Sequence, residues 1–211
     1  MNIRKKTLTM AQFSILLALE AIVCFTPLGS LPIGPMVATL SHIPVIIAAL
    51  LLGTGAGTAM GFFFGLFSFI VWSVMPPNAA TAFVFSPFYS LGQFSGNFWS
   101  IVICFLPRIL IGMVAGSSFS IFQKIFGRFD KTEALSYTLS GILASMTNTV
   151  LVLLGIYLCF GEQYAAANNM THALLLSAIG VTISTNGILE AVLGAVVSYG
   201  VCFPVKKILK Y

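Results

Sequence analysis

The chain has 211 residues, of which 58% are hydrophobic and 7% are charged, and its mean hydropathy is +1.03. Soluble domains carry about 25% charged residues, so this composition excludes a soluble globular protein. The formal net charge of +5 does not indicate a nucleic-acid partner, because nine of the ten basic residues fall in three clusters between or beside apolar runs. The sequence therefore predicts one membrane domain over residues 1–211.

Six apolar segments follow one another along the chain. A transmembrane helix needs roughly 17–25 mostly apolar residues, and residues 8–25, 36–52, 58–74, 97–122, 134–160 and 174–205 meet that requirement. Pro44 is expected to kink the second segment or to begin its regular part, and the glycines of residues 53–57 predict a turn after it. We therefore expect an all-α integral membrane protein, a bundle of six transmembrane helices.

The basic clusters predict the orientation of this bundle, because lysine and arginine concentrate on the cytoplasmic side of a membrane. Four expected spans precede the central cluster and two follow it, so all three clusters can lie on one side. We therefore expect the N- and C-termini in the cytoplasm. The clusters are Arg4, Lys5 and Lys6, then Lys124, Arg128 and Lys131, and finally Lys206, Lys207 and Lys210.

Two of the loops that would face outward, residues 26–41 and 75–96, are long, apolar and rich in proline. Irregular backbone at membrane depth persists only where protein buries it or where it lines a cavity. We expect these loops to fold back over the outer end of the bundle and to cover a pocket. The alternative is that they lie in the headgroup region.

Arg108 lies inside the fourth apolar segment, directly after Pro107. A charged side chain near the bilayer centre costs at least about 2.5–3.5 kcal/mol on insertion scales, so it marks a candidate functional site. A single cation in a cavity open to the outside suits a carboxylate ligand. A structural ion pair with Glu20 or Glu190 is the alternative, and the two roles can coexist.

Neutral hydrogen-bonding side chains in the last two segments add to this candidate site. Asn148 lies in the fifth segment, and Asn186 and Glu190 are four residues apart in the sixth and so share a helix face. Hydrogen bonding between helices is the alternative role for these side chains. Tyr89 lies near an expected outer end, where an interfacial aromatic belt is the alternative to lining the site.

The sequence predicts neither a metal site nor a cofactor nor an enzyme. His42 and His172 have no second ligand at metal spacing, and the four cysteines are scattered through apolar segments, where they act as small packing residues. We find no HExxH, GxSxG or nucleotide-binding glycine–lysine motif. Without a Walker lysine, the chain cannot by itself drive transport with ATP.

The first apolar segment carries a stripe of small residues at intervals of three or four. Such stripes allow helix backbones to approach closely, either against another protein or within this bundle. The stripe consists of Ala11, Ser14, Ala18 and Ala21. A second run, Gly57, Gly61 and Gly65, is assigned to close packing inside the bundle.

The order and spacing of several segments resemble the substrate-binding S components of energy-coupling factor (ECF) vitamin importers, and most closely the pantothenate type. The resemblance extends over nearly the whole chain. It is carried by residues 27–35 (PLGSLPIGP), 41–47 (SHIPVII) and 61–68 (Gly61, Gly65, then LFS), and by Pro107-Arg108, Asn148-Thr149 and residues 186–190.

This resemblance implies a protein of the prokaryotic cell membrane that binds one vitamin near its outer face. The vitamin would lie beneath the first loop, residues 26–41, and the third loop, residues 75–96. It implies docking on a transmembrane coupling subunit with two ATPases, and toppling in the membrane to release the vitamin inward. The small-residue stripe would make the docking contact, with Ser14 where the family usually has alanine.

Within the resemblance each site residue has an expected role. Arg108 would bind the carboxylate of the vitamin, and Asn148 and Asn186 would bind its hydroxyl or amide groups. Glu190, on the same helix face as Asn186, is expected to belong to the same site. His42 and Tyr89 would line the cover. Pantothenate suits this set, but another vitamin, including a pyridoxine-like one, stays an alternative. A membrane scaffold without a ligand, in which the polar residues only pack helices, is the other alternative.

Overall fold

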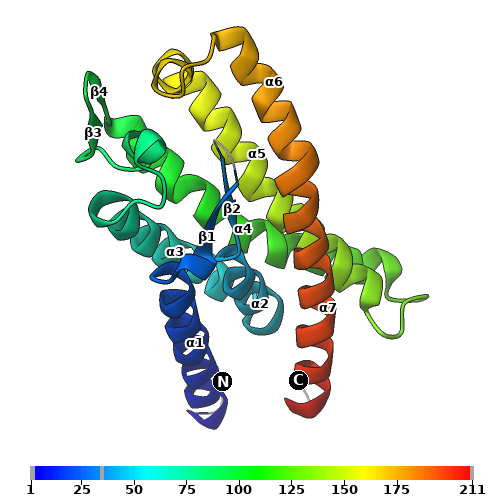
Figure 1. Ribbon diagram of the computed structural model, residues 1–211. Coiled ribbons are helices and arrows are strands. Elements are labelled where there is room, and N and C mark those ends of the chain that lie inside the picture. Colours follow the sequence, from blue (N-terminus) through cyan, green and yellow to red (C-terminus); the bar gives the residue numbers. More distant parts are fainter. Residues whose placement is uncertain (1–2, 34–35, 210–211) are drawn as a thin grey trace.

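The fold comes from a computed structural model, which describes residues 3–33 and 36–209 (Figure 1). Helices form most of this part of the chain, as the apolar segments predict. The helices are α1 (Ile3–Cys24), α2 (His42–Leu52), α3 (Thr54–Val74), α4 (Phe98–Phe126), α5 (Ala134–Ala167), α6 (His172–Thr182) and α7 (Ile188–Leu209), with a π-helical turn (Ile183–Gly187) between the last two.

Five helical segments in the described part of the chain are long and apolar enough to cross a membrane: α1, α3, α4, α5 and the continuous segment His172–Ile208. Helix α2 is apolar but has only 11 residues, which span about 16 Å at 1.5 Å per residue. The helical membrane character is thus confirmed, whereas six spanning helices and the side on which the termini lie stay predictions. The start of α1 and the end of α7 do lie at the same end of the molecule (Figure 1).

The expected start of the second span is wrong. Residues 36–39 form a strand, β2 (Met36–Thr39), that pairs antiparallel with β1 (Ser30–Ile33). The helix begins only at His42 and contains Pro44 in its first turn, where a backbone N–H has no acceptor within the helix and proline is tolerated. Residues 36–39 are therefore extended, because they pair with residues 30–33 instead of continuing the apolar helix.

The expected glycine turn at residues 53–57 is also shorter than predicted. Only Gly53 separates α2 from α3, with a φ of 98° that favours glycine. Gly57 lies within α3, and a Cβ there would come within 2.3 Å of the Ala49 Cβ. The later glycines of this run therefore serve the packing of helices rather than the turn.

The loop of residues 75–96 folds inward rather than extending into solvent. Its 3₁₀-helix, Ala79–Val84, contains Phe83 and Val84, both fully buried, and the Ser100 hydroxyl donates to the Phe83 carbonyl at 2.7 Å. A short hairpin, β3 (Ser90–Leu91) with β4 (Phe94–Ser95), then leads to α4. This burial agrees with the expectation that the loop folds back over the bundle.

The interior has two apolar clusters. The terminus-side cluster includes Phe64, Ile111, Phe119, Tyr137 and Cys202. The loop-side cluster includes Trp72, Phe83, Phe85, Phe160 and Leu175. Figure 1 shows the loop-side elements, the β3–β4 hairpin and the α5–α6 connection, at the end of the molecule opposite the start of α1.

Helices α3 and α4 pack closely along the glycine run of α3. A Cβ at Gly61 would lie 2.2 Å from the Arg108 carbonyl oxygen, and one at Gly65 would lie 2.9 Å from the Phe105 ring. The assignment of this run to internal packing is confirmed. The contact also fixes the backbone of α4 at the residue that carries the intramembrane charge.

Candidate functional site

Polar side chains from several helices are buried together with Arg108. We call this set the buried polar cluster. It comprises Glu20 from α1, Ser41 and His42 at the start of α2, Arg108 from α4, Asn148 and Thr149 from α5, Asn186 from the π-helical turn and Glu190 from α7, all 7% exposed or less. Polar groups inside a membrane bundle mark functional sites when they are not merely pairing helices.

Arg108 lies where the two apolar clusters meet. Its guanidinium carbon is 5.5 Å from the ring centroid of Phe64 and 5.3 Å from that of Phe85, so the cation is packed between an aromatic ring of α3 and one that follows the buried 3₁₀-helix. Cation–π contacts of this kind stabilise a desolvated guanidinium. The sequence pattern gave no signal for either phenylalanine, because both come from distant segments.

The hydrogen bonding of Arg108 is incomplete. Its Nη1 donates to the Ile103 carbonyl oxygen at 2.9 Å, while its Nε is buried and, among the described residues, has no acceptor. A guanidinium has five N–H donors, so most of its hydrogen-bonding capacity is available to a ligand.

The alternative of a structural ion pair is not supported. Within the described residues, Arg108 forms no ion pair with Glu20 or Glu190. Glu20 accepts a hydrogen bond from the Cys24 thiol at 3.1 Å, and Glu190 accepts one from the Thr149 hydroxyl at 2.6 Å. Both acids therefore have nearer partners than the guanidinium.

Part of the cluster is connected through Arg108 and Cys24. Cys24, Cys104 and Glu190 lie within electrostatic range of Arg108, and Ser41 lies beside Cys24. Cys24 thus connects α1 with the start of α2 and with Arg108. Its position four residues after Glu20, on the same helix face, explains only its hydrogen bond with Glu20.

The two asparagines lie on neighbouring elements. The Oδ1 of Asn148 is buried and has no partner among the described residues, and the Oδ1 of Asn186 accepts from the Thr185 hydroxyl at 3.3 Å. A Cβ on Gly187 would be 3.4 Å from the Thr149 methyl group, so the π-helical turn faces this part of α5. Such π-helical turns occur frequently at functional sites.

The two residues expected to line the cover occupy different environments. His42 is fully buried at the first position of α2 and belongs to the buried polar cluster. Tyr89 is half-buried and packs against the loop-side cluster instead. The structure therefore buries His42 at the start of α2 and leaves Tyr89 half-buried against the loop-side cluster.

A pocket of about 360 Å³ opens at the end of α1. It is lined by the end of α1 and by both expected outward loops, through Thr26 and Pro27 of the first and Met75 and Pro77 of the second, and Cys24 also faces it. Of the residues that line it, Cys24 donates a hydrogen bond to Glu20, so the pocket lies next to one member of the buried polar cluster.

The small-residue stripe on α1 lies mostly on the surface. Ala11, Ser14 and Ala18 are exposed and Ala21 is half-buried, while Phe13, Leu16 and Leu17 pack against the terminus-side cluster. The alternative that the stripe packs within this bundle therefore does not account for its first three residues.

A resident metal ion has no obvious place in this arrangement. In residues 3–33 and 36–209, no three His, Cys, Asp or Glu side chains are grouped in a way that could hold a metal ion. The chemistry available is that of one cation surrounded by amide, hydroxyl and carboxyl groups, which suits binding of a small polar solute.

Comparisons with known proteins agree with this description. The family model described as "ECF transporter, substrate-specific component" matches residues 8–202. The chain is 32% identical over 165 residues to the pantothenic acid transporter PanT of Lactococcus lactis, covering 78% of this chain and 75% of that protein. It is 31% identical over 176 residues to the pantothenate transporter PanT of Leuconostoc mesenteroides, covering 82% and 76%.

Among solved structures, the S component for biotin from an ECF-type ABC transporter has the same fold, with a TM-score of 0.51 at 17% identity over 95% of this chain and 93% of that one. The fold of the chain and the family model thus agree. The chain belongs to the family of substrate-specific components of ECF transporters, which are membrane proteins that take up vitamins.

Proposed function

We propose that this chain captures pantothenate at the outer face of the cell membrane for ATP-driven import. The observation that carries the proposal is the buried guanidinium of Arg108, which among the described residues uses only one of its N–H donors in a hydrogen bond. A pocket lined by both outward loops supports the proposal. Pantothenate has one carboxylate, one amide and two hydroxyl groups. Arg108 binds the carboxylate, and Asn148, Asn186 and Glu190 bind the neutral groups.

The names of two relatives support this choice of vitamin, since both are called pantothenate or pantothenic acid transporters. His42 belongs to the same buried cluster and lies at the end of α2 that follows the first loop, where it lines the ligand site. Tyr89 covers the site from the third loop. As a substrate-specific component of an ECF transporter, the chain acts as a binding protein and not as an enzyme.

The proposed orientation places both termini in the cytoplasm and α2 within the bundle as a sixth, shorter membrane helix. The pocket lined by both outward loops then opens to the outside. The exposed stripe of α1 docks on the transmembrane coupling subunit, which carries the two ATPases. A stripe of small side chains on a lipid-facing helix allows a second helix to approach closely, which supports this assignment.

A calorimetric and thermal-shift titration with water-soluble vitamins tests the proposal. A ligand present at 100 times its Kd stabilises the folded state by about 2.7 kcal/mol, so pantothenate is expected to raise the melting temperature clearly. Arg108→Gln is expected to abolish this shift while the protein stays folded. The matched control is Arg128→Gln, which removes an exposed guanidinium from the α4–α5 connection and is expected to leave binding intact.

The other outcomes are equally informative. If another vitamin raises the melting temperature and pantothenate does not, the chain belongs to the same family but binds that other vitamin. No shift with any vitamin, for a protein shown to be folded, would favour the scaffold alternative. Loss of folding in Arg108→Gln would assign the guanidinium a structural role.

A further inference from the structure

Pro107 directly precedes Arg108 inside α4. In an α-helix the N–H of residue 107 would donate to the carbonyl oxygen of residue 103, but proline has no N–H. The Ile103 carbonyl is therefore deprived of its helical donor, and Ile103 is only 3% exposed. An unpaired carbonyl buried at membrane depth is unfavourable.

The Arg108 side chain supplies the missing donor. Its Nη1 lies 2.9 Å from the Ile103 oxygen, so the guanidinium folds back along its own helix and occupies the place of the absent N–H. The rings of Phe64 and Phe85 both lie close to the cation. The backbone beneath it is fixed by α3, since Gly61 leaves no room for a Cβ against the Arg108 carbonyl.

We propose that Pro107 is a positioning residue for ligand binding: by freeing the Ile103 carbonyl, it anchors one nitrogen of the Arg108 guanidinium and presents the remaining donors to a carboxylate. This inference rests on the proposed role of Arg108 in binding the vitamin. A guanidinium held in this way loses little rotational freedom when a ligand arrives, and preorganisation of this kind raises affinity.

The variant that tests this is Pro107→Ala. Alanine restores the N–H and is a good helix former, so α4 is expected to fold, to close the hydrogen bond from residue 107 to residue 103 and to release the guanidinium. The matched control is Pro204→Ala, because Pro204 also lies inside a helix, α7, but lies outside the buried polar cluster.

The readout is the ratio of the affinities for pantothenate and for panthenol, in which a primary alcohol replaces the carboxylate. Loss of the anchored geometry is expected to lower this ratio by about tenfold in Pro107→Ala, the equivalent of one hydrogen bond. Pro204→Ala is expected to leave the ratio unchanged. In an Arg108→Gln background, Pro107→Ala is expected to leave the affinity for panthenol unchanged, since neighbouring residues that act as a unit are not additive.

If Pro107→Ala lowers the affinities for pantothenate and panthenol equally, or leaves both unchanged, the positioning role is overturned while the proposed function stands. If the wild-type protein binds neither ligand, the proposed function fails, and the anchoring of Arg108 is then tested by NMR of the protein without a ligand.

The chain has three arginines, Arg4, Arg108 and Arg128, so ¹⁵N-arginine labelling gives a simple spectrum, in which Arg108→Lys identifies the Arg108 signals. Slow rotation of the guanidinium is expected in the wild type and faster rotation in Pro107→Ala, and identical spectra overturn the inference.

Discussion

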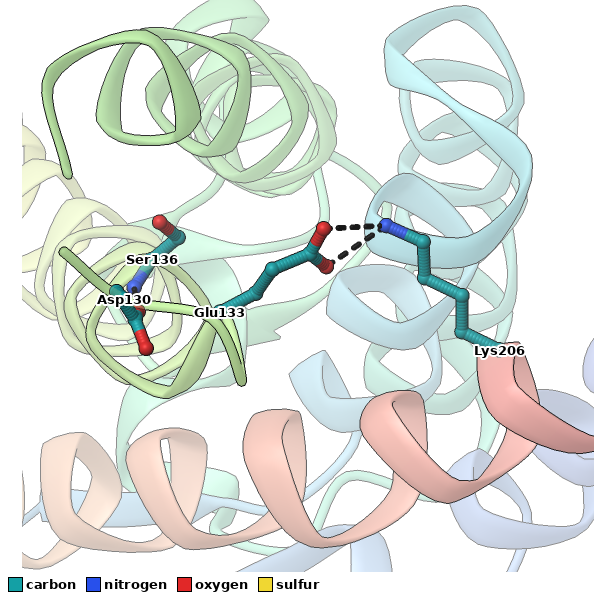
Figure 2. A network of polar contacts seen from close by, with 4 residues as sticks. All are labelled: Asp130, Glu133, Ser136 and Lys206. Atoms are coloured by element: carbon teal, nitrogen blue, oxygen red, sulfur yellow. Dashed lines mark hydrogen bonds and ion pairs between the residues drawn. The ribbon is translucent and has the colours of Figure 1, made fainter. Parts of the chain in front are cut away.

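Glu133 and Lys206, 73 residues apart, form an ion pair in which the lysine Nζ lies 2.8 Å from Oε1 and 2.7 Å from Oε2 of the carboxylate (Figure 2). Lys206 also lies 5.9 Å from the ring centroid of Phe119, which stacks on Tyr137. The lysine of α7 thus contacts both α4 and the start of α5. The contact ties Lys206 of the last basic cluster to Glu133, which follows the central basic cluster in the sequence.

Glu133→Gln is expected to lower the free energy of unfolding by about 0.5–1 kcal/mol, since both side chains are about one-third exposed and such pairs contribute little. Thermal unfolding in detergent at low and high salt measures the effect, and the difference from wild type should shrink at high salt because ions screen the pair. Lys207→Gln, at an exposed position beside Lys206, is the control. An equal loss in both variants would mean that the pair has no specific role.

Asp130 is expected to stabilise the start of α5 in a pH-dependent way. Its Oδ2 accepts a hydrogen bond from the Leu135 N–H at 2.7 Å and one from the Ser136 N–H at 3.5 Å; Figure 2 shows Asp130 beside Ser136. Desolvation raises the pKa of Asp130, but these bonds, with those from Thr132 and Ala134, together hold the pKa below its ordinary value.

Because the pKa is depressed in the folded state, the contribution of Asp130 is present above the ordinary aspartate value of about 3.9 and is lost as the pH falls through the folded value. Asp130→Ala is expected to cost about 1 kcal/mol at neutral pH, as for other helix caps. Melting temperatures measured from pH 7 to pH 3 check this. The difference between Asp130→Ala and wild type should stay constant down to about pH 5 and shrink below about pH 4. If the difference in melting temperature between the variant and wild type does not change with pH, the ionised carboxylate of Asp130 does not stabilise the start of α5.

Gly61→Ala is expected to destabilise the protein by about 1–3 kcal/mol, the usual cost of overpacking a tight interior, because its Cβ would lie 2.2 Å from the Arg108 carbonyl oxygen. Gly55→Ala in the same helix is the matched control, since nothing lies within 4 Å of a Cβ there. Its stability should stay equal or rise slightly, as alanine favours helix. Thermal unfolding of both variants makes the comparison, and similar values for the two would contradict the close packing of α3 on α4.

Ala18→Trp is expected to abolish co-purification with the transmembrane coupling subunit and to leave vitamin binding intact, because Ala18 lies exposed on α1 in the small-residue stripe. An indole at this position prevents the close approach of a second helix. Ala173→Trp, at an exposed position of α6, is the control and should retain the partner. Co-purification of Ala18→Trp at the wild-type level would rule out the stripe as the docking surface.

The fold could be predicted from the sequence wherever one local property decided it. Long apolar runs gave α1, α3, α4 and α5 close to their observed places, because burial of apolar side chains in lipid depends on composition and length alone. Residues 36–39 could not be predicted in this way. They are as apolar as a helix requires, and they form a strand because residues 30–33 lie beside them.

For the candidate site, the sequence by itself determined which residues are out of place in a membrane: Arg108, Asn148, Asn186 and Glu190. It also determined that Pro107 frees the Ile103 carbonyl, since that relation lies within one helical turn. Only the tertiary structure decided the partners. Thr149 reaches Glu190 across 41 residues, and Phe64 and Phe85 enclose the Arg108 guanidinium. A side chain's chemistry is local, whereas its hydrogen-bond and aromatic partners depend on how distant helices pack.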